Sequence, residues 1–258
     1  MFFAFLGTSA AIPSLSRDTT SLVFVGEEEV ILVECGGSPI QKLLAASVDP
    51  LSLTHVLITH LHPDHAYGLP ALIQSLILAG RSAPLSLLCR AEHVEPLTDL
   101  LRIFRLWERP EAFPLQITGV PAREGVEVVS GRSFVVRASP NAHGSMPNLA
   151  ISVELPGRRS AVVYSSDTEP CEAVSRLAAG AHTLIHEATF RAGDRGRYGA
   201  HSTAAEAGQV AAAAGVERLI LTHIEAEYHG EVEALVGEAR REFGGEIEIA
   251  EELRPYPL

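Results

Sequence analysis

The chain has 258 residues, 47% of them hydrophobic, and a formal net charge of −12 at pH 7. This apolar content predicts a large buried core, and since no linker or low-complexity stretch interrupts the chain, we predict one domain over residues 1–258. The negative charge, with 19 arginines but a single lysine, disfavours a broad nucleic-acid surface while leaving room for a small phosphate pocket.

Short runs rich in Val, Ile and Leu predict buried strands, in chain order at residues 2–6, 22–25, 30–33, 55–59, 85–89, 134–138, 150–154, 161–164, 183–186, 218–222 and 247–249. Helices are predicted at residues 39–46, 66–79, 93–107, 171–179, 203–214 and 231–243. Strands that alternate with helices favour an α/β layered architecture, and the second half repeats the pattern of the first. Polar residues follow the carboxyl ends of several strands, where α/β proteins form their sites: His60, Asp167, Glu187 and His223.

The sequence also indicates where the protein resides. No apolar run approaches the roughly 20 residues that a membrane-spanning helix needs, and the apolar N-terminus lacks the positive charge of a secretory leader. The cysteines, Cys35, Cys89 and Cys171, lie far apart with no CxxC pair, which predicts reduced thiols without a disulfide partner. We therefore expect a cytoplasmic protein that makes no membrane contact.

The segment THLHPDHAYG at residues 59–68 concentrates three histidines and an aspartate directly after a predicted strand. His60 and His62 are two positions apart, so their side chains face one side of an extended segment. Asp64 and His65 follow a proline, at an expected helix start, and point in other directions. Imidazole and carboxylate are natural zinc ligands, and two zinc ions about 3.5–4 Å apart form a hydrolytic site. Because a chance surface loop explains four such residues poorly, the spacing H-x-H-x-D-H predicts a site for two metals.

Three further residues can complete this ligand set. His143 lies in the turn Pro-Asn-Ala-His-Gly, while Asp167 and His223 each end a predicted strand. Taken singly, each residue could be an ordinary polar side chain at a strand end. Taken together with the first cluster they suffice for two metals, and the two oxygens of Asp167 could bridge them.

These motifs resemble the metallo-β-lactamase superfamily, whose signature is H-x-H-x-D-H followed by a distant His, Asp and His. More narrowly, the chain resembles ribonuclease Z, the endonuclease that trims tRNA 3′ ends. The resemblance is carried by FLGTSAAIPSLSRDTTS at 5–21, THLHPDHAYGLP at 59–70, YSSDT at 164–168, HEATF at 186–190, HST at 201–203 and LTHI at 221–224. It implies a four-layer αβ/βα sandwich, in which two packed mixed sheets carry helices on both outer faces.

The resemblance also implies a ligand set for two divalent metal ions. The first ion would be held by His60, His62, His143 and Asp167, and the second by Asp64, His65, Asp167 and His223. Zinc is the expected metal, although a His/Asp set does not distinguish it from manganese or iron. Members of this family form dimers, so a homodimer is also expected.

Catalytic roles follow from the same resemblance. A metal-bound hydroxide would attack phosphorus and Asp64 would accept its proton. His201, oriented by Glu187, would act as the general acid that protonates the leaving group. Three residues would contact the phosphate of the substrate: Arg17, Ser166 and Tyr228.

Three departures from the family concern substrate binding. The gap from His143 to Asp167 has room for two strands and a turn at residues 157–159, but not for the long inserted arm with which ribonuclease Z grips tRNA. The family loop P-x-K-x-R-N keeps its proline and Arg17 here but loses the lysine and asparagine, and Glu227 stands where an arginine is usual. We therefore expect a phosphodiester substrate that is either an RNA end or a small molecule.

A fourth departure concerns the metal loop. Glu34 stands where an aspartate usually orients this loop, and its extra methylene is expected to shift that support.

Two other functions stay open from the sequence. One is a lactone, thioester or β-lactam hydrolase on the same scaffold, which would need the metals but not the Glu187–His201 pair. The other is a binding or structural module that has kept the scaffold without catalysis, and the intact ligand set argues against it.

Overall fold

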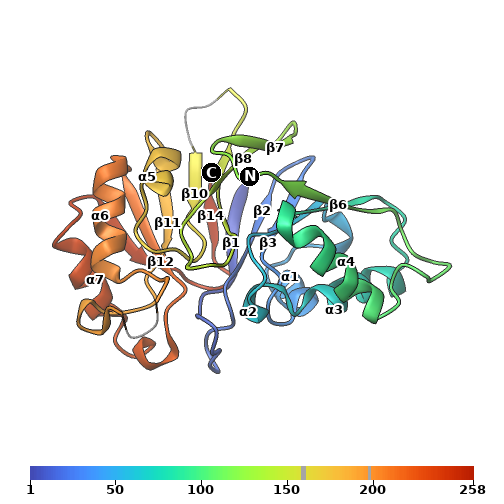
Figure 1. Ribbon diagram of the computed structural model, residues 1–258, viewed down its shortest axis with the longest axis horizontal. Helices are drawn as coiled ribbons and strands as arrows, with labels where there is room; N and C mark the ends of the chain where they lie inside the picture. The colour runs from blue at the N-terminus through green and yellow to red at the C-terminus, as the bar shows by residue number, and fades with distance from the viewer. Residues whose placement is uncertain (158–160, 197–198) are drawn as a thin grey trace.

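Two sheets pack face to face with helices on both outer sides in the computed structural model, which describes residues 1–157, 161–196 and 199–258 (Figure 1). The arrangement confirms the predicted four-layer αβ/βα sandwich of two mixed sheets. None of the described helices is long and apolar enough to cross a membrane.

The first sheet has the strand order β14-β1-β2-β3-β4-β5-β6. Its strands from β3 to β6 run parallel, whereas β14, β1, β2 and β3 pair antiparallel. The bounds are β1 Phe2–Gly7, β2 Ser21–Val25, β3 Val30–Val33, β4 His55–Ile58, β5 Leu85–Arg90, β6 Leu115–Val120 and β14 Pro255–Pro257. Its outer face is covered by α1 Pro39–Ala45, α3 Leu69–Leu78 and α4 Val94–Ile103.

The second sheet has the order β13-β12-β11-β10-β9-β8-β7. It repeats the design of the first, because β10 to β13 run parallel and β7 to β10 antiparallel. The bounds are β7 Val126–Ser130, β8 Val135–Pro140, β9 Leu149–Glu154, β10 Ala161–Tyr164, β11 Thr183–Glu187, β12 Arg218–Thr222 and β13 Glu246–Ile249. Its outer face is covered by α5 Glu172–Ala178, α6 Ala204–Ala214 and α7 Val232–Arg240.

The core between the sheets is aromatic where β1 and β14 meet. Phe3 is stacked on Tyr256 with ring centroids 4.9 Å apart, and Phe5 meets the same ring edge-on at 5.4 Å. All three side chains are almost completely buried. Since fully burying one such side chain stabilises a fold by about 1.5–3 kcal/mol, this cluster fixes the C-terminal strand to the N-terminal one. Both chain ends therefore lie together in Figure 1.

Eleven predicted strands are present, with ends that move by one or two residues. The sequence pattern wrongly predicted no strand at β6, β7 and β14. In β6 only Val120 is buried, and in β7 only Val129, so neither reads as an apolar run. The strand β14 contains two prolines, which fit there because it lies at the sheet edge.

The predicted helix at 66–79 is two helices, α2 Pro63–Ala66 and α3, because each begins with a proline in its first turn. Gly68 lies between them, where its amide donates to Cys35 O and an added Cβ would lie 2.6 Å from that oxygen. Short 3-10 turns are present at 50–52, 91–93, 192–194 and 226–228. The three cysteines are unpaired. The predicted turn at 157–159 lies partly outside the described residues.

Candidate metal centre

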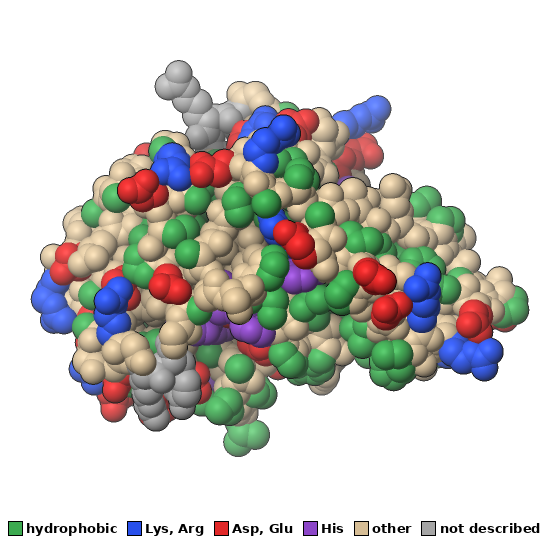
Figure 2. Space-filling model, viewed as in Figure 1, with side chains coloured by type: hydrophobic (Ala, Val, Ile, Leu, Met, Phe, Trp, Pro, Cys, Tyr) green, Lys and Arg blue, Asp and Glu red, His purple; other side chains and the backbone are tan. Residues whose placement is uncertain are grey.

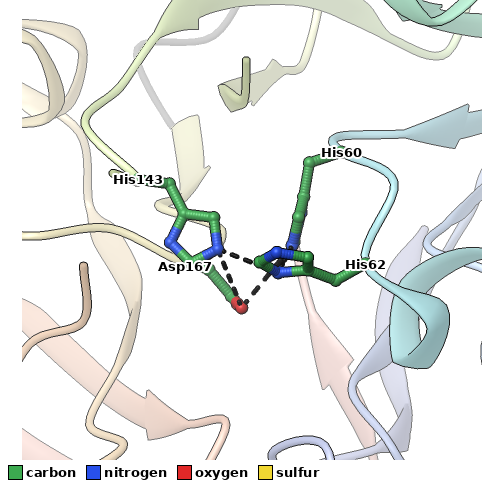
Figure 3. Close-up of side chains that lie close together, drawn as sticks. All are labelled: His60, His62, His143 and Asp167. Carbon is green, nitrogen blue, oxygen red and sulfur yellow. Dashed lines mark hydrogen bonds and ion pairs between the residues drawn. The ribbon is translucent and has the colours of Figure 1, made fainter. Parts of the chain in front are cut away.

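The first predicted ligand group converges where strands of both sheets reach their carboxyl ends (Figure 3). His60 and His62 follow β4, His143 follows β8, and Asp167 follows β10. His62 Nδ1 lies 3.1 Å from His60 Nε2 and 3.0 Å from His143 Nε2. Asp167 Oδ2 lies 3.7 Å from His60 Nε2 and 4.0 Å from His143 Nε2. Four donor atoms therefore face one point from three separate loops.

The second predicted group shares Asp167 with the first. The Oδ2 atom of this residue lies 3.3 Å from His65 Nε2 and 3.2 Å from His223 Nε2. Asp64 Oδ2 lies 3.3 Å from the same nitrogen of His65 and 3.7 Å from that of His223. The donor atoms of each group lie within 4.8 Å of one another.

The donor atoms of the two groups are better placed to bind metal ions than to form hydrogen bonds with one another. His65 Nε2, His223 Nε2 and Asp167 Oδ1 are buried and have no hydrogen-bond partner among the described residues. Buried polar atoms without partners are costly, and a bound cation removes that cost. Ligands about 2.0–2.1 Å from a tetrahedral zinc lie roughly 3.3 Å apart, which is close to the spacing found here. The residues present therefore suit a metal.

Hydrogen bonds orient the imidazole rings. His143 Nδ1 donates to the Ala200 carbonyl at 2.7 Å, so Nε2 carries the free lone pair. His223 Nδ1 lies 2.8 Å from Thr189 Oγ1. Burial, followed by the charges of neighbouring histidines, holds the pKa of His60 well below its usual value, which keeps this ring neutral as a metal ligand must be.

Glu34 contacts the segment at residues 59–65 that contains the first predicted ligands. It is fully buried, it has a positive φ of 64°, and its carboxylate accepts from the Thr59 hydroxyl and, at 3.2 Å, from the Thr59 amide. Its Oε1 also lies 3.5 Å from His65 Nδ1. The glutamate side chain, which is one methylene longer than the aspartate usual in the family, thus reaches the segment that contains the predicted ligands. Its positive φ is a backbone conformation that few non-glycine residues tolerate.

Replacing Glu34 with glutamine should weaken metal binding by roughly 10–100-fold, because the charge facing His65 Nδ1 is lost while the side-chain volume is kept. Competition with a chromogenic chelator measures the affinity. Glu34→Asp restores the charge and should recover part of it. Glu29→Gln, at the turn between β2 and β3, is the control. Equal affinities in wild type and Glu34→Gln would contradict a supporting role.

The predicted acid–base pair lies beside the ligand groups. His201 Nδ1 lies 2.9 Å from Glu187 Oε1, and both carboxylate oxygens of this buried glutamate accept further hydrogen bonds, from the amides of Thr168 and Ser202 and the hydroxyl of Thr189. Thr203 starts α6 with a capping box, so a capped helix holds the histidine that precedes it.

Opposing effects set the protonation of His201. Burial alone would lower its pKa, but the charge and hydrogen bond of Glu187, with the charge of Asp167, raise the pKa to about 9. The same pairing keeps the pKa of Glu187 below its usual value in spite of burial. His201 is therefore an imidazolium at neutral pH, as a general acid requires. Glu187, His201 and His223 also form a further grouping of donor atoms, as do Glu34, His60 and His65.

A cavity of about 450 Å³ opens in front of these groups. Figure 2 shows histidine side chains gathered in a hollow between the two halves of the molecule. Five residues predicted for the site line the cavity: His62, Asp64, Asp167, His201 and His223. The cavity is also lined by Ile12, Phe190 and Glu225, which are not among the predicted site residues although all three lie in or beside the quoted family segments.

The three predicted substrate contacts lie outside this lining among the described residues. Arg17 Nη1 donates to Thr8 Oγ1 at 2.7 Å and to the Ala250 carbonyl at 3.2 Å. Ser166 is fully buried and bonds Thr59 and Asn148. The Tyr228 hydroxyl donates to Asp194 at 2.6 Å. Their contact with phosphate stays a prediction.

Residues 30–224 match a family described as beta-lactamase superfamily domain. Ribonuclease Z of Methanothermobacter thermautotrophicus is 32% identical over an alignment that covers 94% of this chain and 92% of the relative. The chain belongs to the ribonuclease Z-like branch of the metallo-β-lactamase superfamily. Ribonuclease Z of Bacillus licheniformis is also 32% identical, with 94% of each chain covered.

Solved structures agree with this assignment. The short form of human tRNase Z superposes on this ribonuclease Z-like chain with a TM-score of 0.82 at 25% identity, with 100% of both chains covered. The metallo-β-lactamase fold protein YhfI of Bacillus subtilis gives a TM-score of 0.80 at 24% identity, which supports the fold alone, with 99% of this chain and 98% of that chain covered. The protein is therefore a metal-dependent hydrolase, as predicted.

Proposed function

We propose that this ribonuclease Z-like protein is a phosphodiesterase that uses two divalent metal ions, most simply zinc. The observation that supports this best is the Glu187–His201 pair beside two ligand groups that share Asp167. A proton donor in this place serves the alkoxide leaving group of a phosphodiester, whereas the thiolate of a thioester leaves without a proton. The relatives named ribonuclease Z support the same class of bond.

In the proposed mechanism, the residues of this chain bind, orient and transfer protons. Metals held by the two ligand groups would supply a nucleophilic water and offset charge on the phosphoryl oxygens. Asp64, which lines the cavity, would accept the proton of the attacking water. His201 would donate a proton to the leaving oxygen while Glu187 stabilises its charged form. The fixed geometry of Glu187, which has four hydrogen bonds, keeps this donor in place.

We further propose that the substrate is short. The chain between His143 and Asp167 contains β9, β10 and their short connection, which supports a protein without a tRNA-gripping arm at this place. The net charge of −12 also opposes the binding of a long polyanion. A cytoplasmic location agrees with three unpaired cysteines. A homodimer, expected from the family, completes the proposal.

The activity of the metal-loaded protein on bis(p-nitrophenyl) phosphate, compared with lactone, thioester and β-lactam substrates, tests this proposal. Turnover of the diester supports it, and turnover of the other esters alone would refute it. Metal analysis of the same sample tests the non-catalytic alternative. A protein that holds about two equivalents of metal fits a hydrolase, and one that holds none after purification with added zinc would favour the binding module.

The pH dependence of kcat/KM should reflect the protonation of His201. Because its pKa is raised to about 9, the acid is present below that pH, and kcat/KM for an alkyl diester should fall as pH rises through about 9. Glu187→Gln removes the charge that raises the pKa, so the fall should move to lower pH. Initial rates across the neutral and alkaline range measure this. An unchanged profile in the variant would argue that another group donates the proton.

A further inference from the structure

The wall of the cavity contains one carboxylate that belongs to neither ligand group. Apart from Thr189 and the predicted site residues, the described lining consists of Ala10, Ala11, Ile12, Pro63, Phe190 and Glu225. Lysine and arginine are absent from this part of the lining. The cavity is thus apolar on this wall, with a single negative charge.

Glu225 has no partner for its carboxylate among the described residues. It is partly buried and precedes the 3-10 turn at 226–228, but its side chain does not cap that turn. Its backbone is held on both sides, because its amide donates to Thr189 O at 3.3 Å and its carbonyl accepts from Tyr228 N at 2.9 Å. A partly buried charge without a partner costs free energy, which a bound cation would offset.

The segment around Thr8 and Ala10 forms backbone hydrogen bonds beside Glu225 but offers no described positive charge to its carboxylate. Ile224 N donates to Thr8 O at 3.1 Å, and Ala10 N donates to Ile224 O at 3.0 Å. Two described cations bond elsewhere, since Arg17 donates to Thr8 and Lys42 lies 2.7 Å from Glu252. The backbone around Glu225 is thus held by hydrogen bonds, and no described residue neutralises its carboxylate.

We propose that Glu225 determines specificity by binding a positively charged group of the substrate. The cavity would then take small phosphodiesters in which one alcohol carries an amine or quaternary ammonium group. This inference rests on the proposed phosphodiesterase function. The apolar wall suits the methylene or methyl groups of such an alcohol, and an aromatic ring such as Phe190 adds attraction for a cation. The neighbouring phosphates of a longer RNA chain would be repelled by Glu225.

Three p-nitrophenyl diesters with the same leaving group test the proposal on the metal-loaded protein. They are p-nitrophenyl phosphorylcholine, the p-nitrophenyl ester of thymidine 5′-phosphate, and that ester with a further 3′-phosphate, so the second alcohol is cationic, uncharged or anionic. The wild type should show kcat/KM in this order. In Glu225→Gln the preference for choline over thymidine should fall about tenfold, and the discrimination against the 3′-phosphate should fall by a similar factor.

Glu233→Gln is the matched control. It removes the same charge from an exposed side chain in the first turn of α7, outside the described lining, and should keep the wild-type ratios of kcat/KM. Equal shifts in both variants would assign the effect to net charge and overturn the inference. Turnover of all three diesters with the same ratios of kcat/KM in wild type and Glu225→Gln would overturn it as well. If the metal-loaded wild type cleaves none of the diesters, the proposed function itself fails.

Discussion

Replacing Asp167 with asparagine should remove most of the bound metal and lower kcat/KM by about 10³-fold, which corresponds to about 4 kcal/mol. Asp167 is the one carboxylate that both ligand groups share, and it is 2% exposed. Five imidazole nitrogens lie within 4.0 Å of its Oδ2 atom, four from predicted ligands and one from His201. An amide of the same size keeps the shape but loses the charge and one of the two anionic oxygens, so neither metal would keep its full ligand set.

Metal content and diester hydrolysis of the purified variant, measured on the same sample, provide the test. Asp49→Asn is a suitable control, because that carboxylate caps the 3-10 turn at 50–52 and belongs to neither group. Loss of activity with both metals retained would assign Asp167 to proton transfer or substrate binding instead. Wild-type metal content together with wild-type turnover would contradict the shared-ligand role altogether.

The fold was predictable where burial made the sequence pattern strong. Strands such as β4 and β12 are buried along nearly their whole length and read as continuous apolar runs. The strands that were missed lie at sheet edges, where β6 and β7 are mostly solvent-exposed. The strand β14 pairs with the first strand of the chain, and a local sequence pattern does not predict a contact between residues so distant in sequence.

The ligand groups were predictable because metal chemistry restricts the residue types. Seven histidines and aspartates that follow strands in one fixed order indicate metal binding far more strongly than a structural role. Backbone strain was not predictable, although Glu34, Ser166 and His223 all have φ between 54° and 64° close to the metal centre. Such conformations depend on hydrogen bonds from other segments, and non-glycine residues that adopt them cluster at functional sites.

The wall of the cavity could not be derived from the sequence, because it depends on how loops turn. Arg17 bonds inside the protein, where Thr8 and the Ala250 carbonyl accept from its guanidinium. Glu225, only two positions after the predicted ligand His223, lines the cavity instead. A family motif identifies the residue types of a loop, whereas the direction of each side chain follows from packing between loops that are distant in sequence.

Replacing His201 with alanine should lower the hydrolysis of a dialkyl phosphodiester by about 10²–10⁴-fold, because the alkoxide then leaves without a proton. A p-nitrophenyl diester should lose much less activity, since p-nitrophenolate is a weak base that leaves unaided. The ratio of the two effects, measured as kcat/KM on both substrates, separates proton donation from general damage to the site. His182→Ala removes a histidine that bonds Thr183 and lies 3.6 Å from Glu217 outside the site, so it should leave the ratio unchanged.

Metal analysis of the His201 variant decides between two roles for this residue. His201 shares a donor grouping with Glu187 and His223, so it is placed either to donate a proton or to bind a metal. Its hydrogen bond to Glu187 uses Nδ1 and raises its pKa to about 9, which favours the protonated form over the neutral form that binds a metal. The variant should therefore keep the metal content of the wild type. A loss of metal, with both classes of diester affected to the same degree, would show that His201 is a ligand and would exclude it as the acid.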